Sequence, residues 1–291
     1  MTIFNLGSIN ADIVYRVPHL PSPGETLSCG SMSRGLGGKG TNMSVAAARA
    51  AAHVVHIGAV GQDGVWARDR LLEYGVDTRG ISVLDQDASG HAIIYVDDAG
   101  ENTIILYAGT NRLISTQMLA DSLAKAGPDD TLLMQNETNA QVEAARLAAD
   151  KGMKVAYAAA PFQAEAVEAV LSFCDFLILN EVEAAQLQDA TGLAPESLPV
   201  RDVIVTLGAK GSRWHQTETG ECRDFPALPV EVVDTTGAGD TFTGYVLAGL
   251  DRGLPMAQAI SQATRAAALQ VTRLGAADVI PDLKDIQDDV S

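Results

Sequence analysis

The sequence contains little cysteine. Cys29, Cys174 and Cys222 are the only three cysteines among 291 residues, and no two of them form a C-x-x-C pair. An odd number at such wide spacing argues against a disulfide framework and a zinc site, and it fits a reducing cytoplasm. The five histidines also lack the spacing typical of metal ligands. We therefore expect neither disulfides nor a transition-metal centre.

Basic residues are also scarce. Lys and Arg together number 20 against 37 Asp and Glu, which gives a formal net charge of −17. A chain this acidic is repelled by nucleic-acid phosphates and by anionic membrane surfaces. Its apolar runs are far shorter than the roughly 18 residues that cross a bilayer. We expect partners other than nucleic acids and membranes, and a cytoplasmic location.

The sequence does contain ample material for a core, because 47% of its residues are hydrophobic. Short β-branched runs predict strands, and Ala-rich stretches with apolar residues every three or four positions predict helices. Strands are expected at residues 3–7, 53–60, 131–135, 153–157, 175–179 and 203–207, and helices at 42–52, 140–151, 181–190, 241–250 and 255–271. This alternation predicts parallel strands joined by right-handed crossovers in a layered α/β sandwich. Residues 1–291 contain no linker or repeat, so we expect a single domain.

Two segments interrupt the alternation. Residues 15–30 are rich in Pro and Gly, and residues 90–109 alternate around a turn at 97–100 in the manner of a β-hairpin. A hairpin inserted in an α/β chain often covers a site. We expect residues of about 12–34 and 90–109 to form a small lid; the alternative is an extension of a sheet edge without such a role.

A glycine-rich loop, GLGGKG at residues 35–40, precedes the first predicted helix. It matches G-x-G-x-x-G, but residues 31–34 make a poor buried strand and the loop does not follow the first strand, which argues against a dehydrogenase. The lysine is also misplaced for a Walker A loop. Glycines that open a helix let the backbone approach a ligand, and Lys39 and Asn42 add a cation and an amide. We interpret the loop as a ligand site; the alternative is a tight turn, which needs only one glycine.

A second loop lies at the start of another predicted helix. Gly237, Ala238 and Gly239 offer consecutive backbone N–H groups there, an arrangement suited to charge developing on a phosphoryl group. Asp240 follows in the first turn, where a carboxylate can accept a proton from an attacking hydroxyl. Taken alone, a helix cap is an equally good interpretation of Asp240.

These two loops carry a resemblance to a known family. DTTGAGDTF at residues 234–242 resembles the C-terminal signature of the PfkB, or ribokinase-like, carbohydrate kinases, and GGKGTN at residues 37–42 resembles their N-terminal signature. Seven further segments resemble family segments in the same order: GSINAD at 7–12, PSPGET at 21–26, GEN at 100–102, LLMQNE at 132–137, NEVE at 180–183, TLGAKG at 206–211 and VTRLG at 271–275. A single short match is weak evidence for the family. Nine matches in the same order are specific for it, and together they span nearly the whole chain.

The resemblance implies a three-layer α/β/α sandwich with a mostly parallel central sheet and a small β-sheet lid. It implies ATP- and Mg²⁺-dependent phosphorylation of a sugar, most closely at the primary (5-) hydroxyl of D-ribose, by in-line transfer. Asp240 would be the catalytic base, and Gly237, Ala238 and Gly239 would form the anion hole. A homodimer formed through the lid is implied as well.

The resemblance also assigns binding residues by position. Sugar hydroxyls would be bound by Asn10, Asp12, Gly38, Lys39, Asn42 and Glu137, and amides and carboxylates are indeed the usual partners of a polyol. The nucleotide would be bound by Asn180, Glu183, Thr206 and Gly208, with Glu183 reaching Mg²⁺ through water. Asp234, Thr236 and Gly275 would belong to a monovalent-cation site for activating K⁺.

Two departures from the family pattern qualify these expectations. LAPESLP at residues 193–199 replaces about one helix, which we expect to alter stability or assembly rather than activity. After Gly275 the sequence lacks the usual Pro-Ser of the cation loop, which puts K⁺ dependence in question. Alternative substrates are another pentose, a ketose such as fructose, deoxyribose or a nucleoside. A non-catalytic protein that binds sugar or nucleotide is the alternative from another class.

Overall fold

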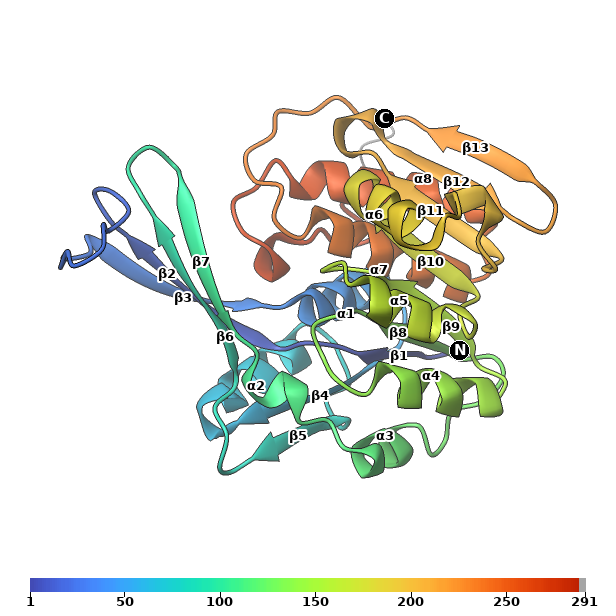
Figure 1. Ribbon diagram of the computed structural model, residues 1–291, viewed down its shortest axis with the longest axis horizontal. Coiled ribbons are helices and arrows are strands. Elements are labelled where there is room, and N and C mark those ends of the chain that lie inside the picture. Colours follow the sequence, from blue (N-terminus) through green and yellow to red (C-terminus); the bar gives the residue numbers. More distant parts are fainter. Residues whose placement is uncertain (288–291) are drawn as a thin grey trace.

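The computed structural model describes residues 1–287, and residues 288–291, the end of the expected domain, lie outside the described part. A nine-stranded sheet forms the centre, in the order β13-β12-β11-β10-β9-β8-β1-β4-β5 (Figure 1). Its strands are β1 (Ile3–Leu6), β4 (Val54–Gly61), β5 (Ile81–Leu84), β8 (Thr131–Met134), β9 (Lys154–Ala158), β10 (Phe176–Asn180), β11 (Asp202–Thr206), β12 (Ser212–Gln216) and β13 (Glu221–Phe225). Only the pairings β11–β12 and β12–β13 are antiparallel.

Helices cover both faces of this sheet. One face packs against α1 (Lys39–Arg49), α2 (Val65–Glu73), α7 (Ala238–Asp251) and α8 (Met256–Gln270). The other packs against α3 (Thr116–Ser122), α4 (Gln141–Asp150), α5 (Ala164–Leu171) and α6 (Glu181–Thr191). The three-layer α/β/α sandwich with a mostly parallel sheet is therefore confirmed.

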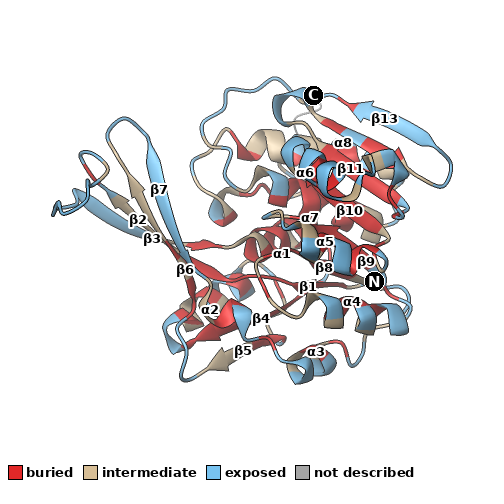
Figure 2. Cartoon of the chain, in the orientation of Figure 1, coloured by how far each residue is buried: buried red, intermediate tan, exposed pale blue. Residues whose placement is uncertain are grey.

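The strand sequences explain why both faces are covered. Successive side chains of a strand point to opposite faces, so in β1 Ile3 joins the core beside α1 and α7, whereas Phe4 and Leu6 join the core beside α3 and α4. Every residue of β1 and β4 is buried, as Figure 2 shows for the centre of the molecule. Apolar side chains on both faces are stable only in the middle layer.

A smaller four-stranded sheet, in the order β3-β2-β6-β7, projects from the main body (Figure 1). It consists of β2 (Asn10–Arg16), β3 (Ser31–Gly37), β6 (Gly90–Val96) and β7 (Asn102–Tyr107). The segments expected to form a lid supply most of this sheet, and the predicted hairpin is β6–β7. All six residues of β7 are exposed, which Figure 2 shows as a pale blue edge.

Several local expectations need correction. Residues 31–34 are exposed, in agreement with a poor buried strand, but they form the first part of β3 in the small sheet, and this strand includes the beginning of the glycine-rich loop as far as Gly37. Within the segment 193–199, Pro195–Ser197 forms a 3₁₀ turn. The sequence patterns also missed α2, α3, α5, β5, β12 and β13, which are short or weakly periodic. Among residues 1–287, no helix combines the length and apolar character needed to cross a membrane.

Candidate active site

The site lies at the carboxyl ends of the parallel strands, around β1 and β8. From β1 the chain proceeds to β4 and β5 on one side, whereas β8 to β11 extend on the other side. Ligands of open α/β sheets bind where the strand order reverses in this way. Ser8 follows β1 and Glu137 follows β8, and the Ser8 hydroxyl donates a hydrogen bond to the Glu137 carboxylate. The two strand ends are thus joined at the reversal point.

Asn10 and Asp12 bring the small sheet to this point. The Asn10 Oδ1 atom accepts a hydrogen bond of 2.7 Å from Asn111, whose own Oδ1 accepts one of 2.9 Å from the Ile9 N–H. Burial, and secondarily the charge of Glu137, raise the pKa of Asp12 to about 6. Two carboxylates near one another and an oriented amide form a cluster of acceptors suited to hydroxyl groups.

The start of α1 lies directly against the end of β1. A Cβ atom added to Gly40 would come within 2.3 Å of the Gly7 Cα atom, so only glycine permits this contact. The contact lets the Lys39 N–H donate a hydrogen bond of 3.0 Å to the Glu137 carboxylate. The negative charges of Asp240, Glu137 and Glu183 raise the pKa of Lys39 against the opposing effect of burial. Lys39 is therefore the cation shared by three carboxylates.

Buried polar side chains stabilise the contact between the end of β1 and the start of α1. Asn5 donates hydrogen bonds to the Gly40 carbonyl at 2.7 Å and to the Ser44 hydroxyl at 2.8 Å, and it accepts one of 2.7 Å from Gln135. The Ser44 hydroxyl lies 2.8 Å from His56 Nδ1. Burial lowers the pKa of His56 to about 4, so this imidazole is neutral at physiological pH. The network ties β1, β4 and β8 to the helix that carries Lys39.

Asp240 lies in the first turn of α7, with 7% of its surface exposed. Its Oδ2 atom accepts a hydrogen bond of 2.8 Å from Asn42 Nδ2, although the two residues are 198 positions apart in the chain. Burial raises the pKa of Asp240 to about 6, while the Lys39 charge and the Asn42 hydrogen bond oppose this rise. The result is a carboxylate with a fixed orientation and enough basicity to accept a proton near neutral pH.

The three small residues before Asp240 form the turn into α7. Gly237 has a φ of 74°, in the left-handed region that favours glycine, and α7 begins at Ala238. Backbone N–H groups at a helix start carry partial positive charge. The Ala238 N–H donates a hydrogen bond of 3.2 Å to the Thr235 carbonyl, whereas the Gly237 N–H has no acceptor within residues 1–287, so the turn presents a free donor close to the Asp240 carboxylate.

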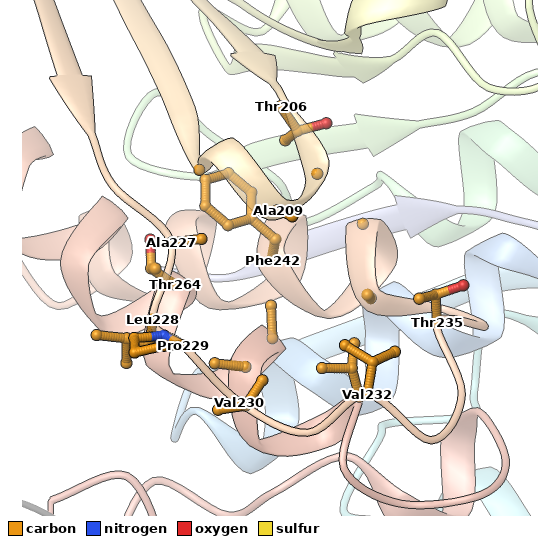
Figure 3. Close-up of a pocket in the computed structure, with 17 residues that line it drawn as sticks. Thr206, Ala209, Ala227, Leu228, Pro229, Val230, Val232, Thr235, Phe242 and Thr264 are labelled. Atoms are coloured by element: carbon orange, nitrogen blue, oxygen red, sulfur yellow. The ribbon is translucent and has the colours of Figure 1, made fainter.

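A cavity of about 480 Å³ adjoins this turn (Figure 3). Ala238 and Gly239 line it beside the helix start, and Phe242 lies one turn further along α7. Thr206 and Gly208, both predicted nucleotide residues, line it from the β11–β12 turn. The remaining lining residues are mostly apolar and come from the β11–β12 turn, the loop before α7, α8 and the residue after α8: Ala209, Gly211, Ala227, Leu228, Pro229, Val230, Val232, Thr235, Thr264, Ala267, Ala268 and Val271. An apolar cavity of this size accommodates a flat heterocycle, with the turn into α7 at its edge.

The other two predicted nucleotide residues lie outside the lining of this cavity. Asn180 and Glu183 form a reciprocal capping box at the start of α6, with both hydrogen bonds at 2.8 Å. Burial raises the pKa of Glu183, against the effects of the Asn180 N–H and of Lys39. Glu183 is therefore close enough to Lys39 for the two charges to interact.

The three residues predicted for a monovalent-cation site are in contact. Asp234 Oδ1 accepts hydrogen bonds from the Thr236 N–H at 2.9 Å and the Thr236 hydroxyl at 2.6 Å, and Oδ2 accepts one of 3.0 Å from the Gly275 N–H. Burial acts in the opposite direction, but these hydrogen bonds lower the pKa of Asp234. Asp234 therefore links the loop before α7 to the loop after α8. Within residues 1–287, no group of three or more His, Cys, Asp or Glu side chains is arranged to hold a metal ion.

Some residues of the site were missed by the sequence patterns. Ser8 lies in a segment that was noted, but its bond to Glu137 depends on a residue 129 positions away. Asn111 follows the hairpin as an isolated amide and carries no signal of its own. Leu228, Pro229 and Val230 form an apolar wall of the cavity, but in the sequence they are indistinguishable from an ordinary loop.

Comparisons with known proteins cover nearly the whole chain. The sequence pattern described as "pfkB family carbohydrate kinase" matches residues 2–283. A ribokinase from Haemophilus influenzae is 37% identical, with 96% of this chain and 95% of the relative covered. A ribokinase from Schizosaccharomyces pombe is 34% identical over 98% of this chain and 96% of the relative. The solved structure of Arabidopsis thaliana ribokinase complexed with ribose and ATP matches with a TM-score of 0.86 at 27% identity, covering 99% of this chain and 97% of that one.

Proposed function

The chain belongs to the pfkB family of carbohydrate kinases, and on this premise we propose that it transfers the γ-phosphoryl group of ATP to the primary hydroxyl of ribose. The expected activity class, a phosphotransferase with an alcohol group as acceptor, follows from the family. Ribose as the acceptor is supported by the ribokinases among the relatives, one of which is described as bound to ribose and ATP.

The observation that carries the proposal is the pairing of a buried carboxylate with an anion-binding turn. Asp240, held by Asn42, directly follows the N–H groups of the turn at residues 237–239. A carboxylate beside an anion hole repels bound phosphate in the ground state, so its presence is explained by proton transfer. Asp240 accepts the proton of the attacking hydroxyl, and the turn stabilises charge on the transferring phosphoryl group.

The surrounding residues divide between the two substrates. Asn10, Asp12, Gly38, Lys39, Asn42 and Glu137 bind the sugar, an assignment supported by their clustering around the ends of β1 and β8. The adenine base occupies the apolar cavity next to Thr206 and Gly208. With the sugar on one side of Asp240 and the nucleotide on the other, the acceptor oxygen and the γ-phosphorus meet at the helix start.

The donor set around the phosphates fits Mg²⁺. One Glu183 oxygen accepts the Asn180 N–H, which leaves the second oxygen for a hydrated hard cation. Mg²⁺ bound with ATP neutralises phosphate charge during the transfer. For K⁺ the side chain of Asp234 is already engaged by Thr236 and Gly275, so backbone carbonyl oxygens of these loops would be the ligands.

A substrate panel tests the proposed reaction. With ATP and Mg²⁺, we expect ADP release to be fastest with ribose, because the cluster around Glu137 and Asp12 suits a small polyol and the chain has few aromatic residues to stack a base. The measurement is coupled ADP release with pentoses, hexoses, ketoses, deoxyribose and nucleosides, each with and without K⁺. Greater efficiency with any other acceptor would reassign the substrate, and silence with all of them would refute the kinase assignment.

We further propose that the small sheet acts as a lid and joins two subunits in a homodimer. The sheet face opposite Asp12 is rich in apolar and aromatic side chains, among them Ile13, Tyr15, Ile93, Tyr95, Ile105 and Tyr107. Ile105 remains 57% exposed, and apolar patches of this kind are typical of protein interfaces.

The charge variant Ile105→Asp tests the dimer. We expect it to convert a dimer into a monomer in analytical ultracentrifugation, because a carboxylate would be buried in an apolar contact. Leu72→Asp on α2 is the matched control, since Leu72 is 60% exposed and lies outside the small sheet. A wild-type protein that sediments as a monomer at micromolar concentration would contradict the proposal.

A further inference from the structure

Gln270 is the last residue of α8 and lies immediately behind the anion-binding turn. Its side chain is completely buried, and its Nε2 atom donates a hydrogen bond of 2.9 Å to the Thr236 carbonyl. A carbonyl oxygen only accepts, so this contact fixes which end of the amide faces Thr236. A Cβ atom added to Gly237 would lie 3.2 Å from the same Nε2 atom.

This hydrogen bond controls the peptide plane that leads into the turn. The Thr236 carbonyl and the Gly237 N–H belong to one planar trans peptide, so they point in opposite directions. With the carbonyl held toward Gln270, the Gly237 N–H is directed away from the protein interior behind it. The structure gives that N–H no acceptor within residues 1–287. It is therefore available to a bound anion.

The chemistry of Gln270 does not suit a purely structural role. The other buried residues of α8 are Ala259, Ile260, Ala263 and Ala266, all of them apolar. Gln270 Oε1 is buried and has no hydrogen-bond partner among the described residues, an arrangement that costs stability. An apolar side chain of similar size would avoid this cost. A polar residue kept at such a position is characteristic of a site where function outweighs stability.

We propose that Gln270 is a positioning residue for phosphoryl transfer, which orients the Gly237 N–H of the anion hole through the Thr236 carbonyl. The inference rests on the proposed kinase function and deepens it. Gln270 touches neither the sugar nor the reacting atoms. Its effect is on the transition state, where charge on the transferring phosphoryl group is largest, rather than on the binding of either substrate.

The isosteric variant Gln270→Met tests this role. We expect kcat to fall at least about 10-fold, because a misdirected donor stabilises the transition state less than a fixed one. KM for ribose and for ATP should stay within about threefold of wild type. The melting temperature should stay equal or rise, since the unpartnered amide oxygen is removed. Loss of activity without loss of stability is an outcome that a structural residue would not produce.

Two further variants make the test decisive. Gln270→Asn retains the amide on a shorter side chain that cannot reach Thr236, so its kcat should fall as well even if the Met variant fails to fold. Gln262→Met on the same helix removes a hydrogen bond of 2.7 Å from Arg252 to Gln262 and should leave kcat unchanged. If a folded Gln270 variant keeps wild-type kcat, or loses no more activity than Gln262→Met, the inference is wrong. An inactive wild-type protein would instead refute the proposed function itself.

Discussion

Replacement of Asp240 by Asn is expected to lower kcat by about 10²- to 10⁴-fold, the usual contribution of a general base. Asn has nearly the same shape, so it can stay beside Asn42 at the start of α7. It has no basicity, however, and the attacking hydroxyl then loses its proton acceptor. KM for ribose and ATP should remain within a few-fold of wild type, because the binding residues are unchanged.

The pH dependence of kcat gives a second measurement on this variant. Asp240 acts as a base only when ionised, and burial raises its pKa to about 6 from the usual 3.8. In the wild-type protein kcat should therefore fall as the pH is lowered through the raised pKa that Asp240 has in the substrate complex. In Asp240→Asn the residual kcat should lose this acid limb. The profile of kcat is used because kcat/KM also contains Asp12, whose pKa is about 6 as well.

Asp251→Asn provides the matched control for this experiment. Asp251 is the last residue of the same helix, α7, and lies far along it from the anion-binding turn. We expect wild-type kcat and an unchanged acid limb in this variant. An Asp240→Asn enzyme that turns over near the wild-type rate would show that another group accepts the proton.

The second large effect is expected from Lys39→Met. Lys39 is the main influence that lowers the pKa of Asp240 against burial, and it is coupled to Glu137 and Glu183 as well. Its removal leaves a group of carboxylates without their shared cation. We expect kcat at pH 7 to fall by about 10²-fold, the magnitude typical of losing one preorganised electrostatic partner of the reacting groups, here the cation beside Asp240. The acid limb of kcat should also shift to higher pH, because Asp240 becomes harder to ionise.

Two companion variants separate charge from geometry. Lys39→Arg keeps the positive charge, so its acid limb should stay near that of the wild type even if the larger side chain lowers kcat. Lys125→Met removes an exposed lysine at the opposite side of the sheet, near α3, and should change neither quantity. If the acid limb of kcat in Lys39→Met coincides with that of the wild type, Lys39 does not lower the pKa of Asp240.

The helices and strands with strong local patterns were predicted correctly. The continuous buried run of β4 and the helical periodicity of the Ala-rich helices α1 and α4 are local signals, which is why the predicted positions agree with the structure to within a few residues. Elements such as β12 and β13 have mixed polar sequences whose strand conformation depends on pairing with β11. Residues 31–34 show the same limit, since β3 is an exposed strand completed by β2.

The candidate site likewise contains residues that short motifs indicate and residues that have no local signal. The glycine-rich turn, Asp240, Lys39 and Glu137 were proposed as site residues from short motifs and the family resemblance that these carry, because loop geometry and reactive side chains are encoded over a few positions. Asn111 and the apolar wall at Leu228–Val230 were not identified, since an isolated amide and an ordinary loop have no local signature. The cluster around Asp234 was predicted as a set, and its hydrogen bonds to Thr236 and Gly275 appear only once α7 and α8 are packed together.

By itself the sequence determined the fold class and the family signatures, and through the family resemblance it indicated Asp240 as the proposed base. All of these depend on residues close together in the chain. Only the tertiary structure decided the environment of that carboxylate: the contact of Asn42 with Asp240 across 198 positions, the burial that raises its pKa to about 6, and the place of Gln270 behind Gly237. The physical reason is that burial and electrostatic coupling are properties of packed segments, which no single stretch of sequence contains.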